Sequence, residues 1–207
     1  MAEIHIIQNG YSTVDNGVMK ANATCSVVVT PANTIIIDTL SPWDSEVIKK
    51  KLQELHIDKV DYVLSTHGHP DHTGNNHLFL NSKHIVGYSV FEKDSYLLHP
   101  FEKGVEFIID DWTKVIPTPG HTSEDVTLLI NTKENKIVAA TGDLFEREED
   151  VIEDPSLWMD SSYDARLQAE NRLKVLSISD VVIPGHGPMF PVSNSHRQAA
   201  QVFYENL

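Results

Sequence analysis

The segment of residues 66–74, THGHPDHTG, constrains the fold of this chain more than any other. Three histidines and one aspartate fall within six residues of it: His67, His69, Asp71 and His72. They follow the apolar run Val60–Leu64, which we expect to be a strand. Imidazole nitrogens and carboxylate oxygens are ligands of cations such as zinc. Because neighbouring residues in a short loop point in different directions, the loop is expected to divide its ligands between two adjacent cations.

Three later segments each present one more side chain that can bind a metal. The turn Pro119-Gly120 precedes His121, and two apolar runs that we expect to be strands lead to Asp143 and His186. A rigid strand or a turn shaped by Gly or Pro, placed directly before a ligand, fixes where that ligand points. The ordered pattern H-x-H-x-D-H, then H, D and H, therefore indicates one site assembled from most of the chain.

This order of motifs resembles the metallo-β-lactamase superfamily of binuclear metal hydrolases, from about residue 4 to about residue 190. The resemblance implies an α/β fold, a four-layer αβ/βα sandwich. It also implies a ligand set: His67, His69 and His121 for the first cation, Asp71, His72 and His186 for the second, and Asp143 bridging both. Two divalent cations are therefore the expected cofactors, with zinc first and iron or manganese as alternatives.

The spacing suits this assignment. His67 and His69 lie two residues apart, so in extended backbone their side chains project to the same side. Past Pro70, the chain can turn Asp71 and His72 toward a second cation about 3.5–4 Å away. A water bridging two cations would lose a proton and become the nucleophile. We predict that Asp71 is also catalytic, because it can orient this nucleophile and accept its proton.

Residues that support the ligands are also predicted. Asp38 ends the expected strand Thr34–Asp38, and in the superfamily an aspartate at this place supports the metal loop without touching the cations. Ligand histidines need an acceptor for their other ring N–H. The alternative for Asp38 is simple capping of its strand. Thr66, Thr118 and Thr122 are further candidates for the same support.

The substrate is predicted from softer features. The stretch Gly142–Arg147, followed by an acidic loop and Trp158, is similar to one group of single-domain members. That similarity implies an RNA phosphodiesterase, an endoribonuclease acting at the 3′ end of replication-dependent histone pre-mRNA. The net charge of −14 opposes nucleic-acid binding. The first alternative is a thioester hydrolase resembling glyoxalase II, or a hydrolase of small esters or lactones. A β-lactamase, an iron-dependent redox enzyme and a non-catalytic binding protein are the remaining alternatives.

Length and composition limit the number of domains, the disulfides and the compartment of the protein. A chain of 207 residues is expected to form a single domain, residues 1–207. Its one cysteine, Cys25, excludes an intrachain disulfide, and the start of the sequence lacks the features of a signal peptide. We therefore expect a cytoplasmic protein, with the nucleus as an additional compartment, and no membrane association. The resemblance also implies a homodimer.

The periodicity of apolar residues predicts strands followed by helices, twice over, and hence two packed sheets with helices outside. The expected strands are Glu3–Gln8, Ala23–Thr30, Thr34–Asp38, Val60–Ser65, His84–Tyr88, Val105–Ile109, Thr113–Ile116, Asp125–Ile130, Lys136–Thr141 and Asp180–Ile183. The expected helices are Ser45–His56, Tyr163–Leu176 and Ser195–Tyr204. We expect the acidic segment Glu146–Asp154 to be a solvated loop.

Other notable residues have ordinary explanations. Phe145 and Trp158 either pack in the core or line a substrate cleft, and Arg147 pairs with the acidic loop or with a substrate anion. Cys25 is expected to be an inert buried thiol. The basic run Lys49–Lys51 reads as a solvated helix face. Six histidines without a motif are expected to be structural or exposed: His5, His56, His77, His84, His99 and His196.

Overall fold

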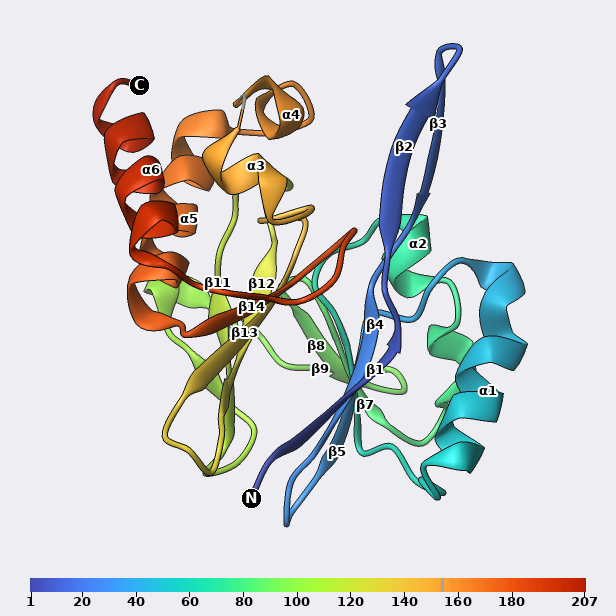
Figure 1. Cartoon of the computed structure of the whole chain (residues 1–207). Coiled ribbons are helices and arrows are strands. Elements are labelled where there is room, and N and C mark those ends of the chain that lie inside the picture. Colours follow the sequence, from blue (N-terminus) through green and yellow to red (C-terminus); the bar gives the residue numbers. More distant parts are fainter. Residues whose placement is uncertain (154) are drawn as a thin grey trace.

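The computed structural model describes residues 1–153 and 155–207. Two large β-sheets face each other, and helices cover the outer surface of each sheet (Figure 1). One sheet has seven strands in the order β1-β4-β5-β6-β7-β8-β9, and the other has six in the order β10-β11-β12-β13-β14-β15. Helix, sheet, sheet and helix are the four layers of an αβ/βα sandwich, which confirms the predicted fold class.

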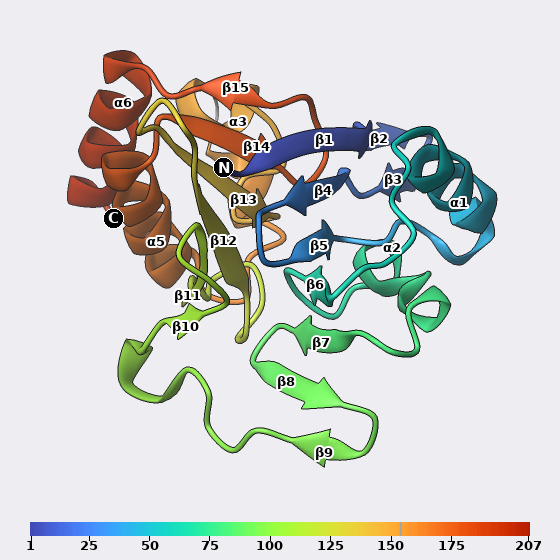
Figure 2. The ribbon, with the colours of Figure 1, turned by 90° about the horizontal axis from the view of Figure 1, so that it is seen from below.

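The seven-stranded sheet runs from β1 at one edge to β9 at the other (Figure 2). Its strands are β1 (Glu3–Gln8), β4 (Cys25–Val29), β5 (Thr34–Ile37), β6 (Tyr62–Ser65), β7 (Lys83–Val86), β8 (Ser89–Glu92) and β9 (Ser95–Tyr96). The central strands β5, β6 and β7 are parallel. Central parallel strands are covered on both faces, which explains their continuous apolar sequences. Helix α1 (Ser45–Glu54) covers the outer face, and Ile48 joins an apolar cluster there with Val27, Ile36 and Val63.

The six-stranded sheet supplies the other half of the sandwich. Its strands are β10 (Phe107–Ile108), β11 (Thr113–Pro117), β12 (Val126–Asn131), β13 (Ile137–Gly142), β14 (Val181–Pro184) and β15 (Phe190–Pro191). Strands β13 and β14 are parallel, so their carboxyl ends meet at one edge of the sheet. The helices on this side are α3 (Glu149–Ile152), α4 (Ser156–Met159), α5 (Ala165–Ile178) and α6 (Asn194–Glu205). Leu176 of α5 and Ala200 of α6 join the apolar cluster over β13 and β14.

The main core lies between the two sheets. Val28, Ile37 and Leu64 of the first sheet belong to the same buried apolar cluster as Leu128 and Ala140 of the second. This packing fixes the distance between the sheets. It therefore also fixes the distance between side chains that follow the strand ends of either sheet, and the predicted ligands follow those ends.

Several short elements were not predicted. A hairpin of β2 (Tyr11–Asp15) and β3 (Val18–Asn22) rises beyond the first sheet (Figure 1). Its tight turn is Asn16-Gly17, and both residues have positive φ. Strands β8, β9 and β15 and helix α4 were not predicted either, nor were the short helical turns α2 (Pro70–Thr73), η1 (Pro42–Asp44), η2 (Asn76–Leu78) and η3 (Glu102–Gly104). Pieces this short carry too little periodicity to be found from sequence.

The acidic segment after Asp143 corrects one prediction. It was expected to be a solvated loop, but it contains helix α3, and Glu146 and Asp150 are buried. The Asp150 carboxylate accepts a hydrogen bond from the backbone N–H of Glu146 and pairs with Arg172 at 2.8 Å. The buried guanidinium of Arg172 thus compensates the buried carboxylate of Asp150. The sequence around Asp150 does not reveal this partner. Asp154, the end of the predicted loop, lies outside the described residues.

The aromatic residues near this segment are packing residues. Phe145 and Trp158 are buried, and the guanidinium of Arg172 lies 4.4 Å and 4.5 Å from their ring centroids. Arg147 lies 3.5 Å from the Glu146 carboxylate, as the prediction of a pair with the acidic loop requires. It also donates a hydrogen bond to the backbone carbonyl of Ser12 in the β2–β3 hairpin, at 3.1 Å. Arg147 therefore ties the hairpin to the loop after β13.

Two further observations concern the chain as a whole. Across residues 1–153 and 155–207, no helix has the length and apolar character needed to cross a bilayer. Cys25 is free and buried, and burial raises the pKa of its thiol well above the usual value, as expected for an inert side chain.

Candidate metal centre

The loop after β6 carries the cluster that the sequence singles out. Strand β6 ends at Ser65, and helix α2 begins at Pro70, with His69 preceding it in extended backbone. Proline suits the first position of a helix because its φ is already helical and its missing N–H is not needed there. The short helix therefore carries Asp71 and His72 on a different element from His67 and His69, while the ring centroids of His67 and His72 stay 4.1 Å apart.

A first group of side chains meets at this loop: His67, His69, His121 and Asp143. Their ligand atoms all lie within 4.8 Å of one another. His67 Nε2 and His121 Nε2 lie 2.8 Å and 3.3 Å from His69 Nδ1. His69 is the exposed member, so the group opens to solvent on its side.

A second group consists of Asp71, His72 and His186, whose ligand atoms also lie within 4.8 Å of one another. The carboxylate of Asp71 is 4.0 Å from His72 Nε2 and 3.8 Å from His186 Nε2. His72 and His186 are buried, whereas the side chain of Asp71 is 19% exposed. Asp71 therefore stands between the buried ligands and solvent.

Asp143 connects the two groups. Its Oδ2 lies 3.4 Å from His121 Nε2 in the first group and 3.1 Å from His186 Nε2 in the second. Its Oδ1 lies 3.3 Å from His72 Nε2. The structure thus brings all seven predicted ligand side chains together in two groups around one shared carboxylate.

Asp38 lies beside the cluster, in contact with His72, where the prediction of a supporting residue places it. It has positive φ, a conformation that aspartate tolerates better than most residues, and this turns its carboxylate toward the metal loop. One oxygen accepts a hydrogen bond from the backbone N–H of Thr66 at 2.8 Å, and the other lies 2.9 Å from His72 Nδ1. This contact leaves His72 Nε2 free to face the site.

Of the three threonines predicted to support the ligands, Thr66 contacts a ligand histidine, whereas Thr118 and Thr122 bond to other residues. The hydroxyl of Thr66 contacts Asp38 and lies 3.2 Å from His67 Nδ1. Thr118 pairs with the hydroxyl of Thr127, away from the ligand rings. Thr122 donates from its backbone N–H and its hydroxyl to Asp125.

Sequence reasoning missed two supports. Asp125 is buried, accepts hydrogen bonds from the turn that carries His121, and lies 4.0 Å from His67 Nδ1. The sequence did hold a signal for this residue. Asp125 directly precedes the apolar strand β12, just as Asp38 directly follows the apolar strand β5. The other support is the backbone carbonyl of Asn22, 3.0 Å from His186 Nδ1. A carbonyl leaves no trace in the sequence.

Two buried polar atoms indicate whether the cluster could hold a cation. Within the part of the chain that the structure describes, His72 Nε2 and Asp143 Oδ1 are buried and make no hydrogen bond. The two atoms lie 3.3 Å from each other, and because buried polar atoms are almost always paired, a cation among the ligands would give both a partner. Both are donors of a lone pair, and both face the other ligands. The cluster is therefore able to bind metal ions.

The charges around the cluster fit the same conclusion. Burial, helped by His72, holds the pKa of His67 well below its usual range, and burial also lowers the pKa of His121, so both rings offer lone pairs. Burial opposes the charge on Asp143, but His72 and His186 hold its pKa well below the usual value. Burial likewise opposes a proton on His72, yet Asp143 and Asp38 raise its pKa. A cation at this place would replace that proton.

The six histidines without a motif lie outside both groups. His196 caps helix α6 together with Ser193 and lies 3.4 Å from Glu148, and His84 Nε2 lies 3.0 Å from the carbonyl of Phe79. These two are structural, as predicted. The basic run Lys49–Lys51 pairs with Glu46 and Glu54 on the surface of α1.

Comparison with known proteins agrees with this geometry. The sequence profile of the Metallo-beta-lactamase superfamily matches residues 20–186. The chain belongs to this superfamily. It is 35% identical over 203 residues to "Metallo-beta-lactamase domain-containing protein 1" of Xenopus laevis, covering 96% of this chain and 84% of the relative.

Two further comparisons show how far the similarity extends. The human protein of the same name is 36% identical over 171 residues, which are 81% of this chain but only 62% of that protein. A solved structure of an N-acyl homoserine lactone hydrolase, with its product bound at the catalytic metal centre, superimposes with a TM-score of 0.65 at 19% identity, covering 89% of this chain and 92% of that one. This last likeness concerns the fold.

Proposed function

We propose that the protein is a metal-dependent hydrolase of ester-type bonds that holds two divalent cations. His67, His69 and His121 would hold the first cation, and Asp71, His72 and His186 the second. The observation that carries this proposal is the position of Asp143, whose Oδ2 lies within 3.4 Å of one group and 3.1 Å of the other. A single carboxylate between two ligand groups is the arrangement that a paired-cation site needs. Zinc is the first choice, with iron or manganese as alternatives.

The cations would polarise the ester oxygen under attack and lower the pKa of a bound water toward about 7. The residues of the chain would do the rest. Asp71 borders solvent and would accept the proton of the attacking water. Asp38 and the carbonyl of Asn22 would keep His72 and His186 in their orientations, because each contacts the ring nitrogen that faces away from the site.

The similarity of Gly142–Arg147 to one group of single-domain members implies a phosphodiester bond of RNA as the substrate. Two cations suit phosphodiester cleavage because they can stabilise both the attacking and the leaving oxygen. The net charge of −14 and the exposed carboxylate of Glu124 beside the site oppose a polyanion. We expect any RNA contact to be weak and to fall steeply with salt.

Small uncharged esters, lactones or thioesters meet no such opposition, and we place them first. A lactone hydrolase shares the fold. An exposed His69 and a partly exposed Asp71 leave room for a small carbonyl compound to reach both groups. RNA stays the second candidate, favoured by the two-group geometry.

The experiment combines metal content by mass spectrometry with a substrate panel on freshly purified protein. The panel holds a labelled histone pre-mRNA 3′ fragment, single-stranded DNA, S-lactoylglutathione, an acyl homoserine lactone and nitrocefin. Wild type is compared with Asp71→Ala and with Asp58→Ala, an exposed carboxylate after α1. We expect about two metals per chain and hydrolysis of a small ester-type substrate that only Asp71→Ala loses.

Other outcomes would redirect or reject the proposal. RNA cleavage dependent on Asp71, with intact small esters, would move the assignment to a ribonuclease. One iron per chain without hydrolysis of any substrate would reject a hydrolase and indicate redox chemistry.

We also propose that the protein is a homodimer. A groove of about 610 Å³ between α3, α4 and α6 is lined largely by apolar side chains, among them Ile152, Val202 and Phe203. Such a face favours association. Light scattering coupled to gel filtration gives the mass; a value near 23.2 kDa, that of one chain, would contradict the dimer.

A further inference from the structure

Two hollows meet beside the candidate metal centre. The nearer one, about 330 Å³, is lined by Gly68, His69 and Thr122 from the centre and by Ser89 and Glu124 on its far side. The farther one, about 560 Å³, is lined by residues of the β8–β9 hairpin and the segment that follows it. Ser89 and Glu124 line both. The two hollows therefore adjoin at these residues, and together we call them the groove beside His69.

Gly87 makes this junction. Its φ is +52°, and a Cβ there would lie 2.7 Å from the carbonyl oxygen of Glu124. A residue without a side chain is therefore required for β7 and β8 to pass this close to the segment Thr122–Glu124. The backbone N–H of Gly87 donates to Ser65 at the end of β6, which fixes the junction to the metal loop.

The farther part of the groove has a mixed lining, with apolar side chains along one stretch of its rim and polar ones elsewhere. Phe101 is buried beneath it, and its ring centroid lies 5.3 Å from that of Tyr88. Three large apolar side chains of the rim face solvent: Tyr96 is 61% exposed, Leu97 52% and Leu98 81%. Consecutive exposed apolar residues on a hairpin are unusual in a protein surface and mark a place where something apolar binds.

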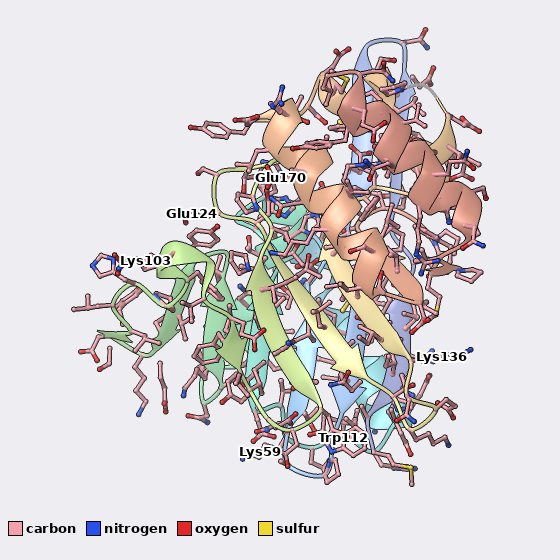
Figure 3. All side chains as sticks on the ribbon, turned by 90° about the vertical axis from the view of Figure 1, so that its left-hand side faces the viewer. Lys59, Lys103, Trp112, Glu124, Lys136 and Glu170 are labelled. Atoms are coloured by element: carbon pink, nitrogen blue, oxygen red, sulfur yellow. The ribbon has the colours of Figure 1, made fainter. Side chains whose placement is uncertain are left out.

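The charges of the groove indicate what the ligand is not. Two carboxylates, Glu102 and Glu124, line it against a single ammonium, Lys103. Figure 3 shows Lys103 and Glu124 on the same flank of the molecule. An anionic chain such as a nucleic-acid strand would meet net repulsion along this path, whereas an uncharged hydrocarbon chain would not.

We propose that this groove binds the apolar arm of the substrate, a straight acyl chain, while the ester bond to be cleaved lies at the metal centre. The inference rests on the proposed hydrolase function for the position of the bond. The length of the groove, from His69 past Ser89 to Leu98, favours esters of medium-chain fatty acids over acetate esters. The apolar rim then provides the contacts that a short acyl group lacks.

The test separates binding from hydrolysis. Binding is followed by amide NMR of the metal-loaded protein titrated with 1-octanol, an uncharged chain that cannot be hydrolysed, and with ethanol as the short control. Hydrolysis is measured as kcat/KM for p-nitrophenyl octanoate and acetate. The variants are Leu98→Asp and, as a matched control, Leu80→Asp, which replaces a leucine that is 75% exposed and lines neither hollow.

We expect octanol, and not ethanol, to shift the amides of Ser89, Leu97 and Leu98. Leu98→Asp should lower the octanoate-to-acetate ratio of kcat/KM about tenfold, the effect of roughly two methylene groups losing apolar contact, and Leu80→Asp should not. Because Leu98 is exposed, its replacement should leave the fold intact, which circular dichroism checks.

The outcomes distinguish the two proposals. Esters hydrolysed at rates independent of chain length and of Leu98 would overturn the groove and leave the hydrolase. Octanol shifts at Ser89 and Leu98 without hydrolysis of any ester would support the groove and reject the hydrolase. Equal shifts with ethanol and octanol would overturn the groove.

Discussion

Both halves of the proposed centre depend on one side chain, Asp143. It is buried, and its two oxygens face His72 on one side and His121 and His186 on the other. Among residues 1–153 and 155–207, no other carboxylate belongs to the first group, and in the second group Asp71 is partly exposed. Charge compensation for cations deep in the site therefore rests on Asp143.

We predict that Asp143→Ala lowers the metal content from about two ions per chain to less than one. The change removes an anion from between the groups and leaves the histidines facing one another without it. Inductively coupled plasma mass spectrometry after gel filtration measures the ratio, with Asp58→Ala as the control. A content of two ions in Asp143→Ala would show that the carboxylate does not bridge.

Asp125 gives a prediction for pH. Burial raises the pKa of its carboxyl from 3.8 to about 6 in the metal-free protein, despite hydrogen bonds from Thr122 and Gly120. The folded state then binds the proton more tightly than the unfolded state, so this stabilisation is present below pH 4 and is lost as pH rises toward 6. The difference is on the order of 2–3 kcal/mol.

Asp125→Asn keeps acceptors and donors for the same neighbours but cannot titrate. In urea titrations of metal-free protein between pH 4 and 6.5, the free energy of unfolding should fall with pH less in Asp125→Asn than in wild type. Asp58→Asn is the matched control for an exposed carboxylate. Parallel curves for wild type and Asp125→Asn would contradict the prediction.

At the scale of elements, the ends of strands determine the site. Strand β13 ends at Gly142, which has φ +52°, and a Cβ there would lie 2.6 Å from Cβ of Thr66. Thr66 in turn is held by Asp38 and follows β6. The ends of β6 and β13 thus approach within contact across the two sheets only because one residue has no side chain.

Gly142→Ala should therefore destabilise the protein by roughly 2–4 kcal/mol, from the left-handed backbone and the clash with Thr66 together. Gly68→Ala, in the same site but with no atom within 4 Å of the added Cβ, should cost less than about 1 kcal/mol. Chemical denaturation compares the two variants. Equal losses would show that the contact between the strand ends is looser than the structure indicates.

The elements also show what sequence alone could predict. Strand β1 has the predicted bounds, and the helix expected at Ser45–His56 is α1, Ser45–Glu54. Long runs of apolar residues with a regular period made these predictions reliable. The β2–β3 hairpin was missed because its two strands are exposed, so their side chains do not alternate between core and solvent.

The candidate site, too, has features that the sequence predicts and features that it does not. That seven candidate ligands and Asp38 come together could be predicted, because rare residue types stand at strand ends in a fixed order. The burial of Glu146 and Asp150 could not, since it depends on Arg172, which lies on α5 far along the chain. The groove beside His69 is formed by short, irregular segments of mixed polarity, and no regular period of apolar residues marks them.

At the scale of the whole molecule, the candidate centre joins the two halves of the sandwich. His67, His69, Asp71 and His72 follow β6 of the seven-stranded sheet. The other ligands, His121, Asp143 and His186, follow β11, β13 and β14 of the six-stranded sheet. Cations bound between them would fasten one sheet to the other.

Removal of metal should therefore destabilise the entire fold. Each of two cations at a free concentration near 100 times its Kd contributes about 2.7 kcal/mol, so the loss of both corresponds to a fall in Tm of roughly 10–20 °C on chelation. Scanning calorimetry before and after EDTA, followed by restoration with zinc, measures the change. An unchanged Tm in protein shown to have lost its metal would mean that the apolar core alone fixes the two sheets.

The contact between His186 and the carbonyl of Asn22 joins residues 164 positions apart. Nearby, the backbone N–H of Thr24 donates to the carbonyl of Gly185 and also joins the N-terminal part of the chain to the turn after β14. A growing chain on the ribosome can build the first sheet and hold His67 beside His69 early. The second site of the proposed centre would form only after β14 has left the exit tunnel and paired with β13 beside the N-terminal segment. A nascent chain truncated before β14 lacks His186 and would therefore not retain a full pair of cations.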